Sequence, residues 1–322
     1  MRPLLPALLL SLVCLTAGCG GDGAGTADPT DSTSSSSASA TPSGAAPADP
    51  GTDPSAEDLP SSELSELASL AEEQATKPPV ISEAVLGADI SWPQCPVGMG
   101  IPLRPTQGMP MPIPAAEYVI IGLTNGPGFT PNPCLADQVA WVRERGLLVA
   151  AYAVVSYPRP AQLRRYGAKG PYDGSTRLGA LRNAGYQQAR YSRGVMETAG
   201  LPSPSLWIDV EPVTAPYAWS GDLRANAAVV RGAARGWSEA GLRIGVYSTP
   251  HLWSTVVGDL RLGLPEWRAA GETSRKEALE RCGDEWSIQG GEAVLAQWVE
   301  RRRDQNVTCP DVEDLAGWFH QF

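Results

Sequence analysis

The chain has 322 residues and a net charge of −10, with 43% hydrophobic and 19% charged residues. This charge is unevenly distributed, because residues 1–83 hold two basic and twelve acidic residues, whereas residues 84–322 hold 23 of each. A segment without a basic excess lacks the positive field that nucleic-acid binding uses, so that class of function is disfavoured. The stretch from residue 84 onward, about 240 residues, is long enough for one large hydrophobic core.

Residues 1–18 predict a lipoprotein signal peptide. Met1-Arg2 precedes an apolar run that ends at Ala17 and is too short for a permanent membrane-spanning helix. Small residues directly before Cys19 match the site at which bacterial lipoprotein precursors are cleaved and lipidated. An ordinary signal peptide with an incidental cysteine is the alternative. We therefore expect an extracytoplasmic protein, anchored to the cell membrane by acyl chains on Cys19.

Residues 19–83 predict a disordered acidic tether. Most of this segment is Gly, Ala, Ser, Thr, Pro and Asp, a composition that cannot bury enough apolar area to offset chain entropy. Residues 62–75 have the periodicity of one short helix, which would be marginal in isolation. An anionic surface would repel the tether. The folded domain is expected over residues 84–322.

Four cysteines lie in that domain: Cys95, Cys134, Cys282 and Cys309. An even number in an exported protein predicts two disulfides with three possible connectivities, of which Cys95–Cys134 and Cys282–Cys309 join neighbouring segments and are favoured. The chain has no C-x-x-C spacing and only two histidines, so a metal site is disfavoured and no cofactor is implied. The two histidines also leave nucleophilic triads without support.

Strand-like and helix-like runs alternate through the domain. Strands are predicted over 85–91, 118–124, 147–155, 205–211 and 243–248, with shorter candidates at 266–269 and 294–299; helices are predicted over 134–145, 178–199 and 223–240. This alternation indicates an α/β fold with a parallel sheet, and about eight strands over this length favour a TIM-type (β/α) barrel, irregular in its last strands. An open doubly wound sheet is the alternative, but no glycine-rich phosphate loop follows the first strand.

The strand at 205–211 ends in Asp209-Val210-Glu211. Alternate side chains of a strand point the same way, so the two acids project together, about 7 Å apart along the backbone. Burying such a pair is unfavourable in free energy, so its presence on a strand indicates a function. Paired carboxylates catalyse the hydrolysis of glycosidic bonds. Asp89 also falls at a strand end, where barrel enzymes carry their sites.

Structural interpretations of the same acids remain open. The pair Asp209 and Glu211 could form an ion-pair node with Arg182 or Arg224, and Asp89 could cap the turn after its strand.

Several motifs resemble glycoside hydrolase family 25, the bacterial and phage muramidases. Gly-Ala-Asp-Ile-Ser-Trp-Pro-Gln at 87–94 resembles the opening strand of that family, and Leu-Trp-Ile-Asp-Val-Glu at 206–211 resembles its catalytic Asp-x-Glu strand. Further matches to its strands lie at 118–124, 146–152, 245–248 and 296–298, so the resemblance covers nearly all of 84–322. A secreted actinobacterial subgroup shares the motifs at 92–95 and 132–135 and a late cysteine pair, and this resemblance supports the favoured disulfides.

The resemblance implies roles for the carboxylates. Glu211 would be the general acid, which needs a pKa raised by desolvation or by a nearby negative charge. Asp209 would supply that charge and orient or stabilise the N-acetyl group of the substrate, or activate a water, while Asp89 would be a second-line carboxylate. Asp304 is the best match for a fourth acid, with Asp311 as the alternative because this region departs from the family pattern.

Four aromatic residues are candidates for substrate binding. Trp92 and Trp219 fall in predicted loops, and Tyr152 and Tyr247 fall at strand ends, where a ring can stack on a sugar; packing in the core is the alternative. The Pro- and Met-rich insertion at 98–114 is a candidate to reshape or cover the groove.

Three functions are compatible with these features. The first is a monomeric cell-envelope glycosidase that cleaves the β-1,4 bond after N-acetylmuramic acid in peptidoglycan, or a bond in a related glycan. The second is a non-catalytic barrel that binds envelope glycan, and the third is a lipoprotein that serves as an interaction scaffold. The convergence of Asp89, Asp209 and Glu211 favours the first, because a pure binding protein does not need desolvated acids.

Overall fold

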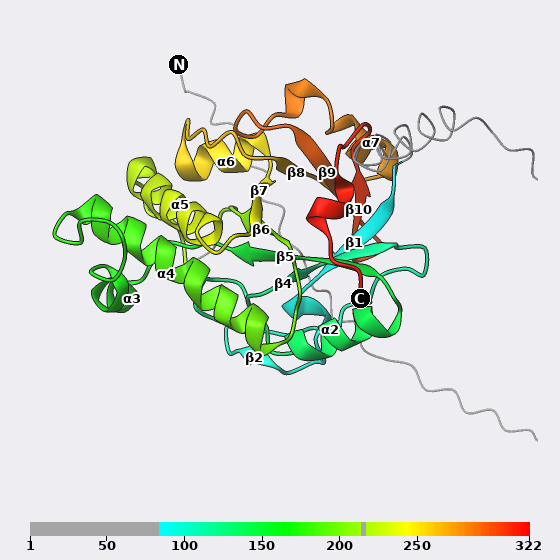
Figure 1. Ribbon diagram of the computed structural model, residues 1–322, viewed down its shortest axis with the longest axis horizontal. Helices are drawn as coiled ribbons and strands as arrows, with labels where there is room; N and C mark the ends of the chain where they lie inside the picture. Colours follow the sequence, from blue (N-terminus) through cyan, green and yellow to red (C-terminus); the bar gives the residue numbers. More distant parts are fainter. Residues whose placement is uncertain (1–83, 214–216) are drawn as a thin grey trace, which may run out of the picture. The chain divides into compact units, whose positions relative to one another are not determined.

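The structure, a computed structural model, describes residues 84–213 and 217–322. The predicted signal peptide, the tether and Cys19 lie outside these residues. In the described part, the strands close into a barrel in the order β1-β10-β9-β8-β7-β6-β5-β4 (Figure 1). These strands are β1 (Leu86–Ile90), β4 (Tyr118–Gly122), β5 (Leu148–Val154), β6 (Ser205–Asp209), β7 (Arg243–Ser248), β8 (Glu266–Glu272), β9 (Ala293–Glu300) and β10 (Arg303–Thr308). The predicted barrel fold is confirmed.

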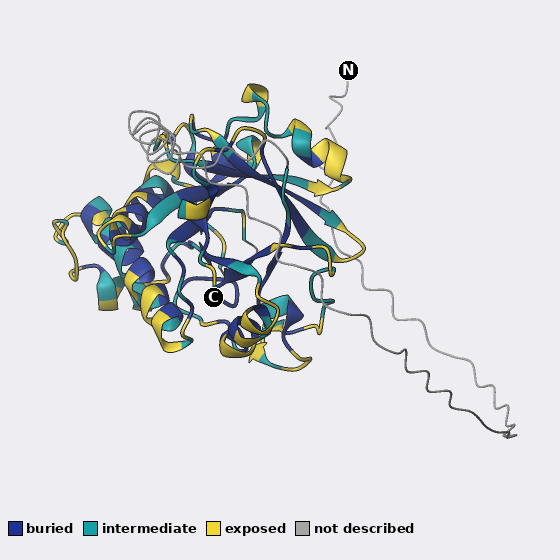
Figure 2. Ribbon diagram, turned by 45° about the vertical axis from the view of Figure 1, so that its right-hand side comes forward, coloured by how far each residue is buried: buried dark blue, intermediate teal, exposed yellow. Residues whose placement is uncertain are grey.

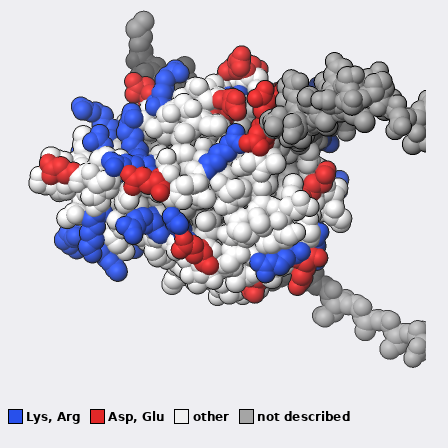
Figure 3. Space-filling model, in the orientation of Figure 1, with Lys and Arg blue, Asp and Glu red and all other residues white. Residues whose placement is uncertain are grey.

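Helices cover the outside of the barrel. They are α2 (Leu135–Glu144), α3 (Pro160–Tyr166), α4 (Arg177–Thr198), α5 (Leu223–Ser238), α6 (Pro250–Val257) and α7 (Arg275–Glu280). None of these helices is both long and apolar enough to cross a membrane, a finding that applies to the described residues alone. On the face drawn in Figure 3, Lys and Arg side chains gather over α4 and α5, where Arg193 pairs with Glu197 and Arg235 with Glu239.

The sheet departs from the all-parallel prediction at β10. This strand runs antiparallel to both neighbours, pairing Asn306 with Gln297 of β9 and with Gly87 of β1. A tight turn at Arg301 and Arg302, which have φ values of 51° and 61°, replaces the crossover helix that a parallel neighbour would need. The sequence of β10, Arg-Asp-Gln-Asn-Val-Thr, is polar because alternate side chains face a polar barrel interior. Hydropathy therefore does not identify β10 as a strand.

Aromatic rings fill the interior at the amino-terminal ends of the strands. The Trp207 ring occupies space that a Cβ atom at Gly245 would enter, with 2.3 Å to the nearest ring atom. Trp318, from the carboxyl-terminal segment, stacks on Trp207 with 4.4 Å between ring centroids. His320 then pairs with Val149 through two backbone hydrogen bonds of 2.8 and 2.9 Å. These contacts close this end of the barrel, whose strands are mostly buried (Figure 2).

Two disulfides join segments at the periphery. The structure links Cys95, after the first strand, to Cys134 at the start of α2, and Cys282, after α7, to Cys309, after β10. This is the pairing that the sequence favours. The first bridge also fixes the base of the 98–114 insertion, whose two short strands are β2 (Gly100–Ile101) and β3 (Arg104–Pro105).

The crossing of α4 and α5 gives a stability test. A Cβ atom at Gly185 of α4 would lie 1.9 Å from the carbonyl oxygen of Val229 in α5, whereas nothing lies within 4 Å of such an atom at Gly194. We expect Gly185→Ala to destabilise the fold by about 2 kcal/mol or more through overpacking. Gly194→Ala, a matched control on the same helix, should stabilise it by about 0.4–1 kcal/mol. Urea denaturation measures both, and equal effects would contradict this description of the crossing.

Candidate active site

Four carboxylates meet in one cavity of about 470 Å³. Asp89 comes from β1, Asp209 ends β6, Glu211 follows it by two residues, and Asp304 lies near the start of β10. Because β10 is antiparallel, its first residues lie at the same end of the barrel as the carboxyl ends of the parallel strands. The structure therefore brings together acids that are up to 215 residues apart in the chain, at the end where barrel enzymes carry their sites.

Asp89 is 6% exposed and is held by two amides. Its Oδ2 accepts a hydrogen bond from Gln297 Nε2 and another from Asn306 Nδ2, both at 2.8 Å. Tyr247 donates to Gln297 Oε1 at 2.7 Å, and Trp267 donates to Asn306 Oδ1 at 2.8 Å. An indole N–H can only donate, so Asn306 must present its oxygen to Trp267 and its amide N–H to Asp89. Oδ2 of Asp89 therefore acts only as a hydrogen-bond acceptor.

The pKa of Asp89 is raised well above its usual value. Burial is the main cause, and the charges of Asp304 and Glu211 add to it, while the two amide hydrogen bonds act in the opposite direction. Since Oδ2 accepts two hydrogen bonds, the proton of the neutral form belongs on Oδ1. Asp89 is therefore a fixed carboxyl group whose second oxygen is available to the cavity.

Asp209 is 5% exposed, and its buried Oδ1 has no hydrogen-bond partner among the described residues. Burial, then the charges of Glu211 and Asp89, raise the pKa of Asp209 well above its usual value. A buried acceptor without a donor is costly when it is charged, so this environment favours the neutral form of Asp209.

Glu211 is half-buried, as is Asp304, whereas Asp89 and Asp209 are buried. Burial, followed by the charge of Asp304, raises the pKa of Glu211 to about 7. Asp304 itself has a pKa raised by burial to about 6, against a side-chain hydrogen bond from Gln94 that lowers it. Trp219 donates its indole N–H to the Glu211 carbonyl at 2.8 Å and so fixes the backbone that carries this acid. Near neutral pH the cavity thus contains an acid poised between its two protonation states.

Three of the four predicted aromatic residues, Trp92, Tyr152 and Tyr247, line the cavity. Burial raises the pKa of Tyr152 and of Tyr247 well above 10, so both remain neutral hydroxyl groups. Trp219 is not among the lining residues, and its contact with the Glu211 backbone makes it a support for the site.

The ion-pair alternative for the acids is wrong. Arg182 and Arg224 line a separate cleft between α4, α5 and the segment after α6, and in the described chain neither pairs with Asp209 or Glu211. Asp311, the alternative fourth acid, is exposed and lines a different hollow near Arg243, beyond the other end of β10.

The unpredicted residues of the site include Gln297, Asn306, Trp267 and Arg104. Gln297 lies in a motif that matches a late family strand, but nothing in the sequence pairs it with Asp89. Asn306 lies in a strand that hydropathy does not reveal, and Arg104 lies in the insertion. The described residues contain no group of three or more His, Cys, Asp or Glu arranged to hold a metal ion.

The raised pKa of Glu211 has a consequence for stability. A carboxyl group whose pKa is higher in the folded than in the unfolded state costs nothing below the unfolded value, here about 4.5. Its cost then grows as the pH rises from about 4.5 and is complete above about 7. We expect Glu211→Gln to unfold like the unmodified chain at pH 4. At pH 8 it should be more stable by on the order of 1–3 kcal/mol, allowing for partial exposure. Thermal unfolding at both pH values measures this; exposed Glu117→Gln is the control, and a gain independent of pH would contradict the assignment.

Comparison with known proteins agrees with the motifs. A family model described as "Lysozyme-like protein 1" matches residues 179–275, which include Asp209 and Glu211 but neither Asp89 nor Asp304. A search of curated proteins finds no match.

Several solved structures are similar to this chain. A family GH25 lysozyme from Aspergillus fumigatus is 15% identical, covers 70% of this chain and 94% of its own length, and has a TM-score of 0.44. A bacterial lysozyme from Streptomyces coelicolor is 14% identical over 73% of this chain and 96% of its own, with a TM-score of 0.44. The modular autolysin LytC from Streptococcus pneumoniae is 14% identical over 70% of this chain, with a TM-score of 0.42, and this chain spans 46% of its length. The family-model match at residues 179–275 agrees with the predicted resemblance to lysozymes.

Proposed function

We propose that this chain is a cell-envelope glycoside hydrolase that cleaves β-1,4 bonds in the glycan strands of peptidoglycan. The observation that carries the proposal is Glu211, an acid with a pKa of about 7 in a cavity that it shares with three other carboxyl groups. The family motifs and the lysozyme-like segment at 179–275 support peptidoglycan as the substrate.

Glu211 acts as the general acid. With a pKa of about 7 it is about half protonated at neutral pH, so it can give its proton to the glycosidic oxygen as the bond to the leaving sugar breaks. Asp304 maintains this state, because its charge raises the pKa of Glu211. After bond cleavage the glutamate can take a proton from the water that attacks the sugar.

Asp209 orients and stabilises the sugar that becomes cationic. Asp209 lines the cavity beside Glu211, where it would lie next to the N-acetyl group of a bound sugar. When charge develops at the anomeric carbon, an oriented N-acetyl oxygen and a nearby carboxylate both lower the energy of the transition state. Asp89 is held in place by Gln297 and Asn306, and its charge adds to the rise in the pKa of Asp209.

The proposed location follows from the leader and the tether. Lipidation of Cys19 would hold the enzyme at the outer face of the cell membrane, and residues 20–83 would allow the domain to reach the cell wall.

Release of reducing ends from purified peptidoglycan tests the catalytic role. We expect Glu211→Gln to lower kcat at least about 100-fold, the usual contribution of a general acid, with Glu117→Gln as a control that retains activity. Equal release by the unmodified chain and by Glu211→Gln would exclude Glu211 as the acid. If the unmodified chain binds peptidoglycan in a pull-down but releases no ends, a non-catalytic glycan-binding barrel is the function instead.

The pH profile tests the coupling between the two acids. Because the charge of Asp304 raises the pKa of Glu211, Asp304→Asn should lower that pKa and move the alkaline limb of kcat/KM towards lower pH. Asp311→Asn, a matched substitution outside the cavity, should leave the profile in place. An unchanged alkaline limb in Asp304→Asn would show that Asp304 does not set the pKa of the catalytic acid.

A further inference from the structure

One cation lines the cavity together with its four acids. Arg104 is the one basic residue among the described residues that line it, and its side chain is half-buried. It belongs to β3, in the insertion at 98–114, so the barrel strands do not supply it. No ion pair joins Arg104 to a carboxylate of the described chain, so its guanidinium is not neutralised by the acids that line the same cavity.

The backbone of Arg104 is fixed to the barrel. Asn125, fully buried in the loop after β4, accepts a hydrogen bond from Ile101 N at 2.8 Å and donates one to Arg104 O at 3.4 Å. One amide thus binds both strands of the β2–β3 hairpin. Thr106 N donates to Met99 O at 2.9 Å, and the Cys95–Cys134 disulfide ties down the base of the insertion. The hairpin is therefore a fixed wall of the cavity.

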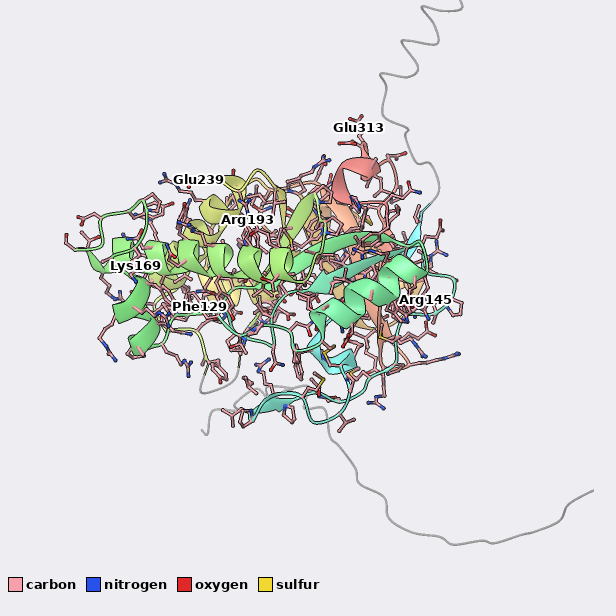
Figure 4. The ribbon with its side chains drawn as sticks, turned by 60° about the horizontal axis from the view of Figure 1, so that its bottom comes forward. Phe129, Arg145, Lys169, Arg193, Glu239 and Glu313 are labelled. Atoms are coloured by element: carbon pink, nitrogen blue, oxygen red, sulfur yellow. A yellow bond between two sulfur atoms is a disulfide. The ribbon has the colours of Figure 1, made fainter. Side chains whose placement is uncertain are left out.

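The side chain of Arg104 lies over the loop at 124–130. A Cβ atom at Gly126 would lie 2.7 Å from both Cδ and Nη1 of Arg104, and Gly126 has a φ of 84°, so this loop needs glycine for its backbone and leaves room for the arginine. Phe129, labelled in Figure 4, holds the same loop against α3 by stacking on Tyr166, with 4.4 Å between ring centroids. The guanidinium therefore has a defined place at the rim.

We propose that Arg104 forms a subsite for a carboxylate carried by a sugar of the bound glycan. This inference rests on the proposed function, because it requires a glycan in the cavity. A guanidinium matches a carboxylate with two parallel hydrogen bonds, and a partly buried arginine without a partner retains that capacity. A phosphate monoester is disfavoured, because its charge of about −1.5 to −2 would face four acidic groups. The N-acetylmuramic acid units of peptidoglycan carry such a carboxylate when their peptides are absent.

Binding measurements separate this subsite from catalysis. The full chain with Glu211→Gln would be titrated by calorimetry with peptide-free peptidoglycan strands, which bear free carboxylates, and with the same strands after methyl esterification. Arg104→Gln should weaken binding of the free strands about 10-fold and leave binding of the esterified strands unchanged, since only the charge-assisted hydrogen bonds are lost. Arg104→Lys should recover part of the lost binding, because lysine restores the positive charge but not the two parallel N–H donors of the guanidinium.

Arg302→Gln is the control, since it removes the same charge at the same end of the barrel from an exposed residue outside the cavity lining. Equal weakening for both forms of the strand, or an equal effect of Arg302→Gln, would overturn the subsite. Release of reducing ends by the unmodified chain, together with no preference for free over esterified strands, would overturn the subsite and retain the glycosidase. Charge-dependent binding through Arg104 without any release would retain the subsite and overturn the glycosidase.

Discussion

The burial of four carboxyl groups in one cavity is the constraint on which the site depends. Desolvation raises the pKa of all four acids, and the charges of neighbouring acids raise it further for Asp89, Asp209 and Glu211. The hydrogen-bond donors that oppose this rise in pKa differ between the acids. Asp89 has two amide donors, Asp304 has Gln94, and Asp209 has an oxygen without any donor in the described chain. These unequal environments give acids of one chemical type different protonation states near neutral pH, and different protonation states allow different roles.

The antiparallel β10 makes this arrangement possible. A β9–β10 hairpin puts Gln297 and Asn306 side by side on the inner face of the barrel, and β1 on the other side of β10 brings Asp89 to both amides. The two-residue alternation of the same strand also places Asp304 at the cavity. At the opposite end of the interior, Trp207, Trp318 and the small residues beside them form a closed apolar floor. Burial of the apolar floor stabilises the folded state and offsets the free-energy cost of burying the four acids. The barrel can therefore keep this unfavourable group of charges in place.

The sequence indicates the site unevenly, and the reason is physical. Asp209 and Glu211 could be predicted as a pair because an i, i+2 spacing on a strand is local information. The roles of Gln297 and Asn306 cannot be predicted from neighbouring residues in the sequence, because these amides come within hydrogen-bond distance of Asp89 only when the barrel closes. Likewise β10 looks like a polar loop, because the pattern that marks a strand assumes an apolar core. Trp219 shows the converse error, since a loop tryptophan was expected to face substrate and instead supports the Glu211 backbone.

Arg104 shows how an insertion can add a cation to an acidic site without disabling it. An arginine paired with Glu211 or Asp304 would favour the carboxylate and lower the pKa that acid catalysis requires. The pKa of Glu211 is instead set by burial and by Asp304, and Arg104 pairs with neither acid in the described chain. The hairpin fixes the position of this cation, because Asn125 holds the Arg104 backbone and the Arg104 side chain lies against Gly126. A positive charge kept apart from the acids in this way can act on the ligand and not on the catalytic proton.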